Sequence, residues 1–260
     1  MSQPIPAFFS HLEEITARLK DKELFLFLDY DGTLTPIVDT PDLAVISDEM
    51  REMVIRSAAA HMTAIVSGRA TDDVRSKVRV DGIYYAGSHG FEIVGPDGNV
   101  HQNPQAAQIR ESVKTIHAEL SDRLAGVKGA LVEDVKYTIS VHYRLVAETD
   151  FHKIEEAVTD TLERYPDFRR TSGKKVFEVR PKIDWDKGKA VEWIFDELQF
   201  DSTQHIAVYI GDDTTDEDAF AVLKGKGFGI LVADCAKESL AEYQVRDTPE
   251  VKKVLEFLAT

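Results

Sequence analysis

The fold is decided by the stretch Phe25-Leu26-Phe27-Leu28-Asp29-Tyr30-Asp31-Gly32-Thr33-Leu34. A short uncharged apolar run that enters a glycine turn is typical of a strand buried in a parallel sheet. Side chains two residues apart share a strand face, so we expect Asp29 and Asp31 to converge at the carboxyl end, where open α/β sheets bind ligands. Two carboxylates there repel each other and lose hydration, so they need a cation, a proton or a reaction. The alternative is an ordinary strand followed by a polar turn, which is the commoner meaning of this pattern.

The composition indicates a globular protein with an acidic surface. The chain has 260 residues, 43% of them hydrophobic, enough for one full domain and a smaller one. Its formal net charge of -15 argues against a nucleic-acid partner or an anionic membrane surface. Cys235 is the single cysteine, so no internal disulfide can form and we expect a cytoplasmic location. We find neither an apolar run of membrane-spanning length nor a signal-peptide pattern in residues 1–20.

Predicted strands and helices alternate along most of the chain. Helical apolar spacing occurs at Asp48–Ala58, at Lys187–Leu198 and after Thr248, which we expect to cap the last helix ahead of Pro249. The alternation predicts an α/β fold, with a mostly parallel Rossmann-like sheet covered by helices on both faces. The core strands are expected at Leu24–Asp29, Thr63–Ser67, Ile83–Ala86, His205–Gly211 and Gly229–Val232.

The middle of the chain follows a different pattern. After a hairpin pattern and a break at Asn103-Pro104, the elements follow in the order α-β-β-α-β-β, with Ser172-Gly173 joining the last two strands. Pro181 ends this segment, and the alternation resumes. We therefore expect an inserted α+β domain at 104–181, in which two helices back a small antiparallel sheet, and a core formed by 1–103 and 182–260. Two chain crossings of this kind make a natural hinge.

Polar clusters occur where core strands end or a core helix begins. Asp29 and Asp31 follow the first strand, Ser67 the second and Asp212 a later one, while Lys187 begins the helix after the insertion. The carboxyl ends of parallel strands meet at one sheet edge, so we expect these groups to lie together. Aspartate oxygens suit Mg²⁺, a serine hydroxyl and a helix amino terminus suit phosphate, and a lysine neutralises charge during phosphoryl transfer. One aspartate can act as a nucleophile and a second as an acid and base.

These motifs resemble those of the haloacid dehalogenase superfamily of phosphatases. Asp29–Leu34 matches the first motif, and Ser67, Lys187 and Gly211-Asp212-Asp213 match the second, third and fourth in order. The insertion falls where that superfamily places its C2-type cap. The resemblance implies that Asp29 is the nucleophile, that Asp31 is the general acid and base, and that Ser67 and Lys187 hold the transferred phosphoryl group. It implies a Mg²⁺ ion bound by Asp29, the carbonyl of Asp31 and Asp212, with Asp213 and Asp216 as ligands or supporting groups.

Further segments resemble the trehalose-6-phosphate phosphatase family, and together they cover nearly the whole chain. These segments are Gly87–Glu92, Val132–Lys136 with His142–Arg144, Val176–Pro181 with Trp185–Gly188, and Gly211–Phe220. The resemblance implies hydrolysis of trehalose 6-phosphate to trehalose and phosphate, with a separate trehalose-6-phosphate synthase as a candidate partner. It implies that the cap recognises the sugar, and the candidate substrate-binding residues are Glu133, Lys136 and Glu178, followed by Arg69, His89 and Lys174.

Other interpretations stay open at this point. One is a phosphatase of the same architecture that acts on sucrose phosphate or mannosylglycerate phosphate, although the long fourth motif argues against it. Another is a non-catalytic sugar-phosphate sensor, which would usually have lost a catalytic residue. Taken alone, His89 is more consistent with a buried packing histidine, Arg69 with an ion-pair partner and Lys174 with a solvated turn.

Overall fold

The computed structural model describes residues 5–235 and 237–260, and these form two compact units. The core unit comprises 71–101, 185–260 and the N-terminal part of the chain through Ser67. The inserted unit comprises 102–184 together with Gly68–Ala70. The segment predicted as an insertion, 104–181, lies inside the second unit.

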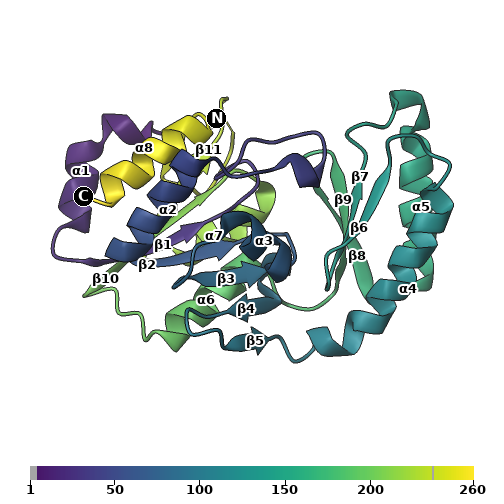
Figure 1. Ribbon diagram of the computed structural model, residues 1–260, viewed down its shortest axis with the longest axis horizontal. Coiled ribbons are helices and arrows are strands. Elements are labelled where there is room, and N and C mark those ends of the chain that lie inside the picture. The colour runs from purple at the N-terminus through teal and green to yellow at the C-terminus, as the bar shows by residue number, and fades with distance from the viewer. Residues whose placement is uncertain (1–4, 236) are drawn as a thin grey trace. The chain divides into compact units, whose positions relative to one another are not determined.

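The core unit is built on an eight-stranded sheet with the order β12-β11-β10-β1-β2-β3-β4-β5 (Figure 1). Neighbouring strands are parallel from β12 to β3, and β4 runs antiparallel to β3. The predicted α/β class with a mostly parallel sheet is confirmed. The strands are β1 (Glu23–Leu28), β2 (Met62–Val66), β3 (Tyr84–Gly87), β4 (Glu92–Val94), β5 (Val100–Gln102), β10 (His205–Gly211), β11 (Gly227–Val232) and β12 (Tyr243–Val245).

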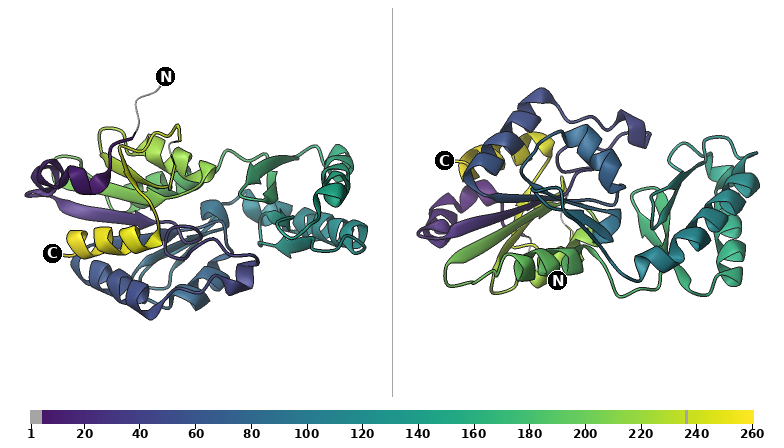
Figure 2. Two further views of the ribbon diagram at one scale, coloured as in Figure 1. Left: turned by 90° about the horizontal axis from the view of Figure 1, so that it is seen from above. Right: turned by 60° about the horizontal axis from the view of Figure 1, so that its bottom comes forward.

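Helices cover both faces of this sheet (Figure 2). Leu24, Leu26 and Leu28 of β1 pack in one hydrophobic cluster, with α1 (Leu12–Leu19), α2 (Asp48–Ala60), α3 (Thr71–Val78) and α8 (Thr248–Leu258). Phe25 and Phe27 pack in the other, with α6 (Lys187–Glu197) and α7 (Glu217–Val222). Because β1 is buried on both faces, its sequence is a continuous apolar run rather than an alternating one.

The inserted unit has a four-stranded antiparallel sheet with the order β6-β7-β9-β8. Its helices, α4 (Ala106–Leu124) and α5 (Phe151–Arg164), pack on one face of that sheet through a shared hydrophobic cluster (Figure 1). The predicted α-β-β-α-β-β order is therefore confirmed. The strands are β6 (Leu131–Asp134), β7 (Ile139–His142), β8 (Phe168–Gly173) and β9 (Val176–Pro181).

Two local predictions are wrong by one or two residues along the chain. Ser172 and Gly173 pair with Phe177 and Val176, so they belong to β8, and the turn falls at Lys174 and Lys175 instead. The cap of α8 is not Thr248 but Asp247, whose carboxylate accepts a hydrogen bond from the amide of Glu250 at 2.9 Å. An extended Asp directly before a helix satisfies an amide that the helix leaves unpaired.

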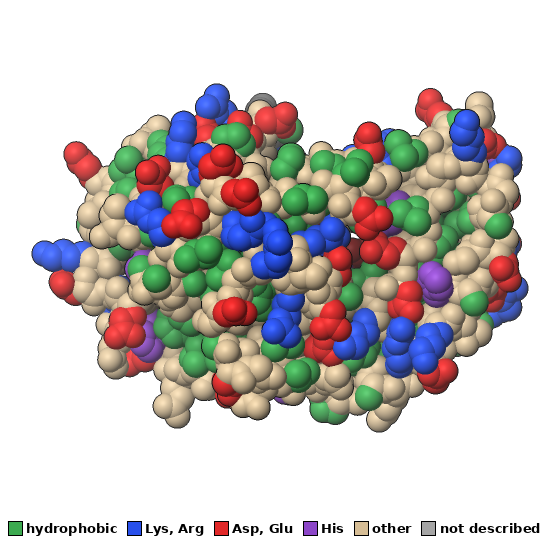
Figure 3. All heavy atoms as spheres, in the orientation of Figure 1, with side chains coloured by type: hydrophobic (Ala, Val, Ile, Leu, Met, Phe, Trp, Pro, Cys, Tyr) green, Lys and Arg blue, Asp and Glu red, His purple; other side chains and the backbone are tan. Residues whose placement is uncertain are grey.

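Short 3₁₀ segments complete the described part of the chain. They are η1 (Phe8–Ser10), η2 (Pro41–Leu43), η3 (Ser88–Gly90), η4 (Glu148–Asp150) and η5 (Thr214–Asp216). Two of them, η3 and η5, contain the predicted site residues His89 and Asp216. On the face drawn in Figure 3, acidic and basic side chains are scattered among one another. Among the helices of the described residues, none combines the length and the apolar character needed to cross a membrane.

Candidate active site

Three predicted site residues directly follow three adjacent core strands. Asp212 follows β10, Asp29 follows β1 and Ser67 follows β2, and these strands are neighbours in the order β10-β1-β2. The sheet ladder continues into two of these residues: the amide of Asp29 donates to the carbonyl of Ile210, and that of Ser67 to the carbonyl of Ala86, both at 2.9 Å. All three residues are buried. Parallel pairing thus brings residues far apart in sequence to one sheet edge.

The turn after β1 wraps around one carbonyl group. The carbonyl of Tyr30 accepts hydrogen bonds from the amides of Leu34 and Thr35 at 2.9 and 3.0 Å. Gly32 lies in this turn with a φ of +87°, and a Cβ atom there would stand 2.0 Å from Oδ2 of Asp212. Only glycine tolerates both the backbone conformation and the approach of that carboxylate. Asp31, half-buried, lies in the same turn.

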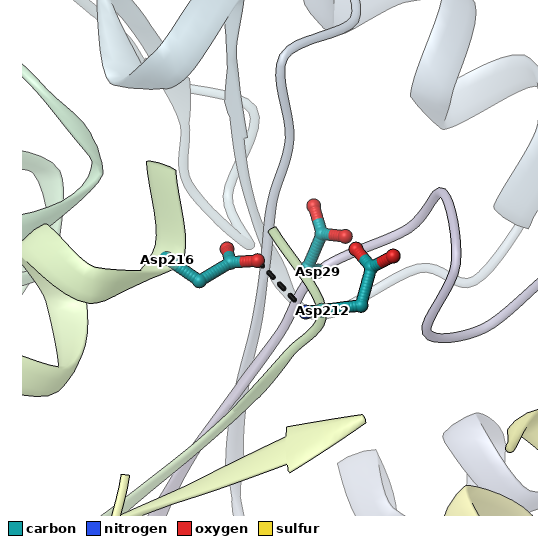
Figure 4. A group of neighbouring side chains, drawn as sticks. All are labelled: Asp29, Asp212 and Asp216. Atoms are coloured by element: carbon teal, nitrogen blue, oxygen red, sulfur yellow. Dashed lines mark hydrogen bonds between the residues drawn. The ribbon is translucent and has the colours of Figure 1, made fainter. Parts of the chain in front are cut away.

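A buried cluster of three carboxylates lies at this edge of the sheet (Figure 4). Asp29, Asp212 and Asp216 each offer a carboxylate oxygen, and these oxygens lie within 4.8 Å of one another. The amine of Lys187 lies 2.7 Å from Oδ1 of Asp29 and 2.7 Å from Oδ1 of Asp216. With every group ionised, three negative charges face one positive charge, which leaves an excess of two. Such an excess is costly to bury, and a hard divalent cation with oxygen ligands would neutralise it.

Asp216 has protein partners on both carboxylate oxygens. Oδ2 accepts hydrogen bonds from the amides of Asp212 and Asp213 at 2.9 Å each. Oδ1 accepts from the amine of Lys187 and from the buried hydroxyl of Tyr209, each at 2.7 Å. A carboxylate offers about four lone-pair positions, so these four donors account for all of them. Asp216 therefore anchors both the turn that carries Asp212 and the amine of Lys187.

Burial and neighbouring charge act in opposite directions on Lys187. Burial lowers the pKa of Lys187, but the carboxylates of Asp216 and Asp29 outweigh this and hold the pKa well above its usual range. The amine is therefore a cation at neutral pH. Burial raises the pKa of Asp29; Lys187 opposes that shift, whereas Asp216 and Asp212 reinforce it. A bound cation would favour the ionised form of Asp29.

A strained turn connects the Ser67 region with α6. Ser88 and His89 have φ angles of 49° and 57°, in the left-handed region that residues other than glycine rarely adopt. The amide of His89 donates to the carbonyl of Ser67 at 2.9 Å. A Cβ atom on Gly90 would stand 2.3 Å from the Cβ of Ala190 on α6, the helix that Lys187 begins. The turn thus contacts the elements that carry Ser67 and Lys187, and the His89 side chain is buried within it.

The open face of the inserted sheet carries a row of polar residues. Glu133, Ser140, Glu178 and Thr171 pair in register across all four strands. Their strand neighbours Ile139, Val141, Phe177 and Val179 pack against α4 and α5, so the row faces away from the helices. A carboxylate oxygen of Glu133 lies 3.0 Å from Nε2 of His142, and the hydroxyl of Thr171 donates to Glu178 at 3.5 Å.

The remaining predicted residues divide between the two units. Asp213 is half-buried in the core unit and accepts a hydrogen bond from the amide of Thr214 at 2.7 Å, so it caps η5. Lys136 lies in the turn between β6 and β7, and Lys174 in the turn between β8 and β9. Arg69 is buried and groups with the inserted unit.

Sequence reasoning missed several residues that contact the predicted site. Tyr209 was treated as part of an apolar strand, although a tyrosine in a strand buried on both faces needs a hydrogen-bond partner and so signals a polar neighbour. His142 lies in a segment that resembles the family, but the sequence did not predict its contact with Glu133. Ser140 and Thr171 become visible only once strand register places them beside Glu133 and Glu178.

The core and inserted units together define a class of protein. An α/β core with aspartates at the ends of β1 and β10, interrupted by a separate α+β unit, is the architecture of haloacid dehalogenase-type phosphatases. The chain belongs to the trehalose-phosphatase family, whose sequence profile matches residues 27–249.

Similar proteins agree with this assignment. The chain is 45% identical to the probable trehalose-phosphate phosphatase D of Arabidopsis thaliana over 97% of its own length and 72% of that protein. It is 43% identical to the probable trehalose-phosphate phosphatase 3 of Oryza sativa subsp. japonica, over 97% and 74% of the two chains. The C-terminal domain of C. albicans trehalose-6-phosphate phosphatase has the same fold, with a TM-score of 0.81, 22% identity and 99% coverage of both chains. The sucrose-phosphatase of Synechocystis is more distant in fold, with a TM-score of 0.56, 16% identity and coverage of 91% and 98%.

Proposed function

We propose that this chain is a Mg²⁺-dependent phosphomonoesterase that hydrolyses trehalose 6-phosphate to trehalose and phosphate. The observation that carries the proposal is the buried group of Asp29, Asp212 and Asp216 around the amine of Lys187, in a chain of the trehalose-phosphatase family. Such a site combines a nucleophile, anionic oxygen ligands and a fixed cation.

The first half of the reaction is transfer of the phosphoryl group to Asp29. A carboxylate oxygen of Asp29 attacks phosphorus as the bond from phosphorus to the sugar oxygen breaks. Asp31 donates its proton to that oxygen, so trehalose leaves as a neutral alcohol. Ser67 and Lys187 hold the transferred group, and the ammonium of Lys187 offsets its negative charge.

The second half returns Asp29 to its starting state. Asp31, now ionised, takes a proton from a water molecule, whose oxygen attacks the phosphorus of the aspartyl-phosphate. The bond between phosphorus and the carboxylate oxygen breaks, releasing phosphate and leaving Asp31 protonated. One carboxylate thus serves as acid and then as base.

The residues present fit a magnesium ion. Asp29, Asp212 and the backbone carbonyl of Asp31 would hold it, and it would neutralise the excess charge and polarise phosphoryl oxygens. We assign Asp216 to anchoring, because its four lone-pair positions have protein donors. Asp213, which caps η5, supports the same turn.

Sugar recognition is assigned to the inserted unit, taken as a cap of residues 104–181. Glu133 and Glu178 lie on the polar row of its open face, where carboxylates can accept hydrogen bonds from sugar hydroxyls. Lys136, in the turn between β6 and β7, is the third residue assigned to the sugar. Further candidates for contact with the substrate are Arg69, His89 and Lys174. A partnership with a separate synthase stays a prediction.

Phosphate release from a substrate panel tests this function. The panel is trehalose 6-phosphate, sucrose 6-phosphate and glucose 6-phosphate, each assayed with Mg²⁺ over a range of concentrations. We expect kcat/KM to be highest for trehalose 6-phosphate. Equal values across the panel would contradict a dedicated disaccharide site, and no release from any substrate would favour a sensor.

A further inference from the structure

We propose that Arg110 is a positioning residue for sugar recognition, because together with Asp134 it fixes the backbone of Lys136. The proposal rests on the proposed function, since Lys136 is assigned there to the sugar. Arg110 lies on α4, one of the helices that cover the inserted sheet. Its partners lie at the end of β6 and in the turn that follows.

A two-pronged ion pair joins α4 to the end of β6. Nη1 and Nη2 of Arg110 donate to Oδ1 and Oδ2 of Asp134 at 2.7 and 2.8 Å. A planar guanidinium matches a carboxylate in this geometry, which fixes direction as well as distance. Asp134 pairs across the sheet with Ile139, which belongs to the hydrophobic cluster beneath the helices. Asp134 therefore faces α4, whereas Glu133 faces the open side of the same strand.

The same two side chains also bind both polar backbone groups of Lys136. Nη1 of Arg110 donates to the carbonyl of Lys136 at 2.8 Å, and the amide of Lys136 donates to Oδ1 of Asp134 at 2.8 Å. An ordinary surface ion pair would have no such contact with a third residue. The arrangement couples the position of Lys136 to the pair.

Lys136 needs such support because of its backbone conformation. Its φ of 68° lies in the left-handed region, which disfavours a residue with a Cβ atom. The neighbouring residues Val135 and Tyr137 are buried, and the Lys136 amine lies 5.7 Å from the centre of the Tyr137 ring. Without the pair, the turn can relax toward a less strained conformation. The lysine side chain would then leave the turn in another direction.

Steady-state kinetics of Arg110→Met and Arg110→Lys test the proposal. The substrates are trehalose 6-phosphate and p-nitrophenyl phosphate, which has no sugar. For Arg110→Met we expect KM for trehalose 6-phosphate to rise about tenfold, with kcat and the kcat/KM for p-nitrophenyl phosphate little changed. Arg110→Lys keeps the charge but not the two-pronged geometry, so it should restore only part of the loss. An unchanged KM, or an equal loss with both substrates, would overturn the proposal.

A double-mutant cycle separates positioning from an independent contact. Lys136→Ala should raise KM for trehalose 6-phosphate, and adding Arg110→Met should raise it little further, since both changes remove the same contact. If the increases in KM of the two single variants multiply in the double variant, Arg110 acts independently of Lys136. Arg123→Met is the matched control on α4: its guanidinium binds Asp160 at 2.6 Å, so its loss should leave KM unchanged.

The substrate preference of the wild-type enzyme tells whether a negative result contradicts the role of Arg110 or the proposed function. If wild type prefers another sugar phosphate of the panel, the assigned substrate is wrong, and the Arg110 comparison is made with the preferred substrate. A rise in KM for that substrate would still support positioning. If wild type acts on none of the sugar phosphates in the panel, both proposals are overturned.

Discussion

The amine of Lys187 lies 2.7 Å from a carboxylate oxygen of Asp29, although 158 positions separate the two residues in the chain. Both side chains are almost completely buried. Lys187 begins α6 and Asp29 directly follows β1, so packing of this helix on the sheet sets their distance. The close pair leaves Asp29, the proposed nucleophile, beside a fixed positive charge that would offset the negative charge of a transferred phosphoryl group.

Asp29→Asn should abolish turnover, because an amide is a poor nucleophile toward phosphorus. We expect kcat for trehalose 6-phosphate to fall on the order of a thousandfold or more, with the circular dichroism spectrum unchanged. Asp122→Asn, at an exposed position on α4, is the control and should retain full activity. A turnover rate near that of wild type in Asp29→Asn would exclude the mechanism.

Removal of Mg²⁺ should affect both activity and stability. EDTA should stop phosphate release, and added Mg²⁺ should restore it. Because the proposed ion would bind the native state, it should also raise the free energy of unfolding of the wild-type protein by RT ln(1 + [Mg²⁺]/Kd). The melting temperature should rise accordingly. Asp212→Asn should remove most of this stabilisation. If Mg²⁺ raises the melting temperature of Asp212→Asn as much as that of wild type, the ion binds elsewhere.

Gly90→Ala should weaken both the fold and the activity. The new Cβ would stand 2.3 Å from the Cβ of Ala190, at a backbone φ of +90°. We expect a loss of about 1–3 kcal/mol in the free energy of unfolding, and a lower kcat, because α6 must move and Lys187 with it. Urea unfolding and steady-state kinetics measure the two effects.

The double variant Gly90→Ala/Ala190→Gly identifies the cause. It removes the contact while keeping the strained backbone, so kcat should recover in part. Ala190→Gly alone is the reference. If kcat of the double variant stays as low as that of Gly90→Ala while the reference is active, the contact with α6 does not explain the loss.

The contribution of Asp134 to stability should depend on acidic pH. Partial burial favours a higher pKa for Asp134, but hydrogen bonds from Arg110 and the Lys136 amide outweigh it and hold the pKa below its usual value. A lowered folded-state pKa stabilises the fold above the unfolded-state pKa of about 3.9, and this stabilisation is lost as the pH falls through the folded-state value. Since the pair with Arg110 is still partly open to solvent, we expect this stabilisation to be at most about 1 kcal/mol.

Asp134→Asn mimics the protonated form and therefore provides the comparison. The difference in free energy of unfolding between wild type and this variant should be constant from about pH 7 to pH 5 and should shrink below about pH 4. Urea unfolding at each pH measures it. A difference that stays the same into the acid range would mean that the charge of Asp134 does not stabilise the fold.

Long apolar elements were predictable because their patterns are local. The apolar run of β1 and the three- and four-residue spacing in α2, α6 and α8 result from burial on the sheet, so they mark these elements in the sequence. The short strand β12, of three residues, carries too little pattern to be recognised. Ser172 and Gly173 were wrongly placed in the connection because strand register, not turn composition, decides where β8 ends.

The sequence by itself determined the family, the order of elements and the identity of the acidic and basic residues in each motif, because these depend on neighbours along the chain. Only the tertiary structure decided which of these groups meet. The four donors to Asp216 come from β10, the following turn and the start of α6, and Arg110 reaches Lys136 from a separate helix. Such contacts depend on how helices pack on sheets, and no spacing within one segment of the chain encodes them.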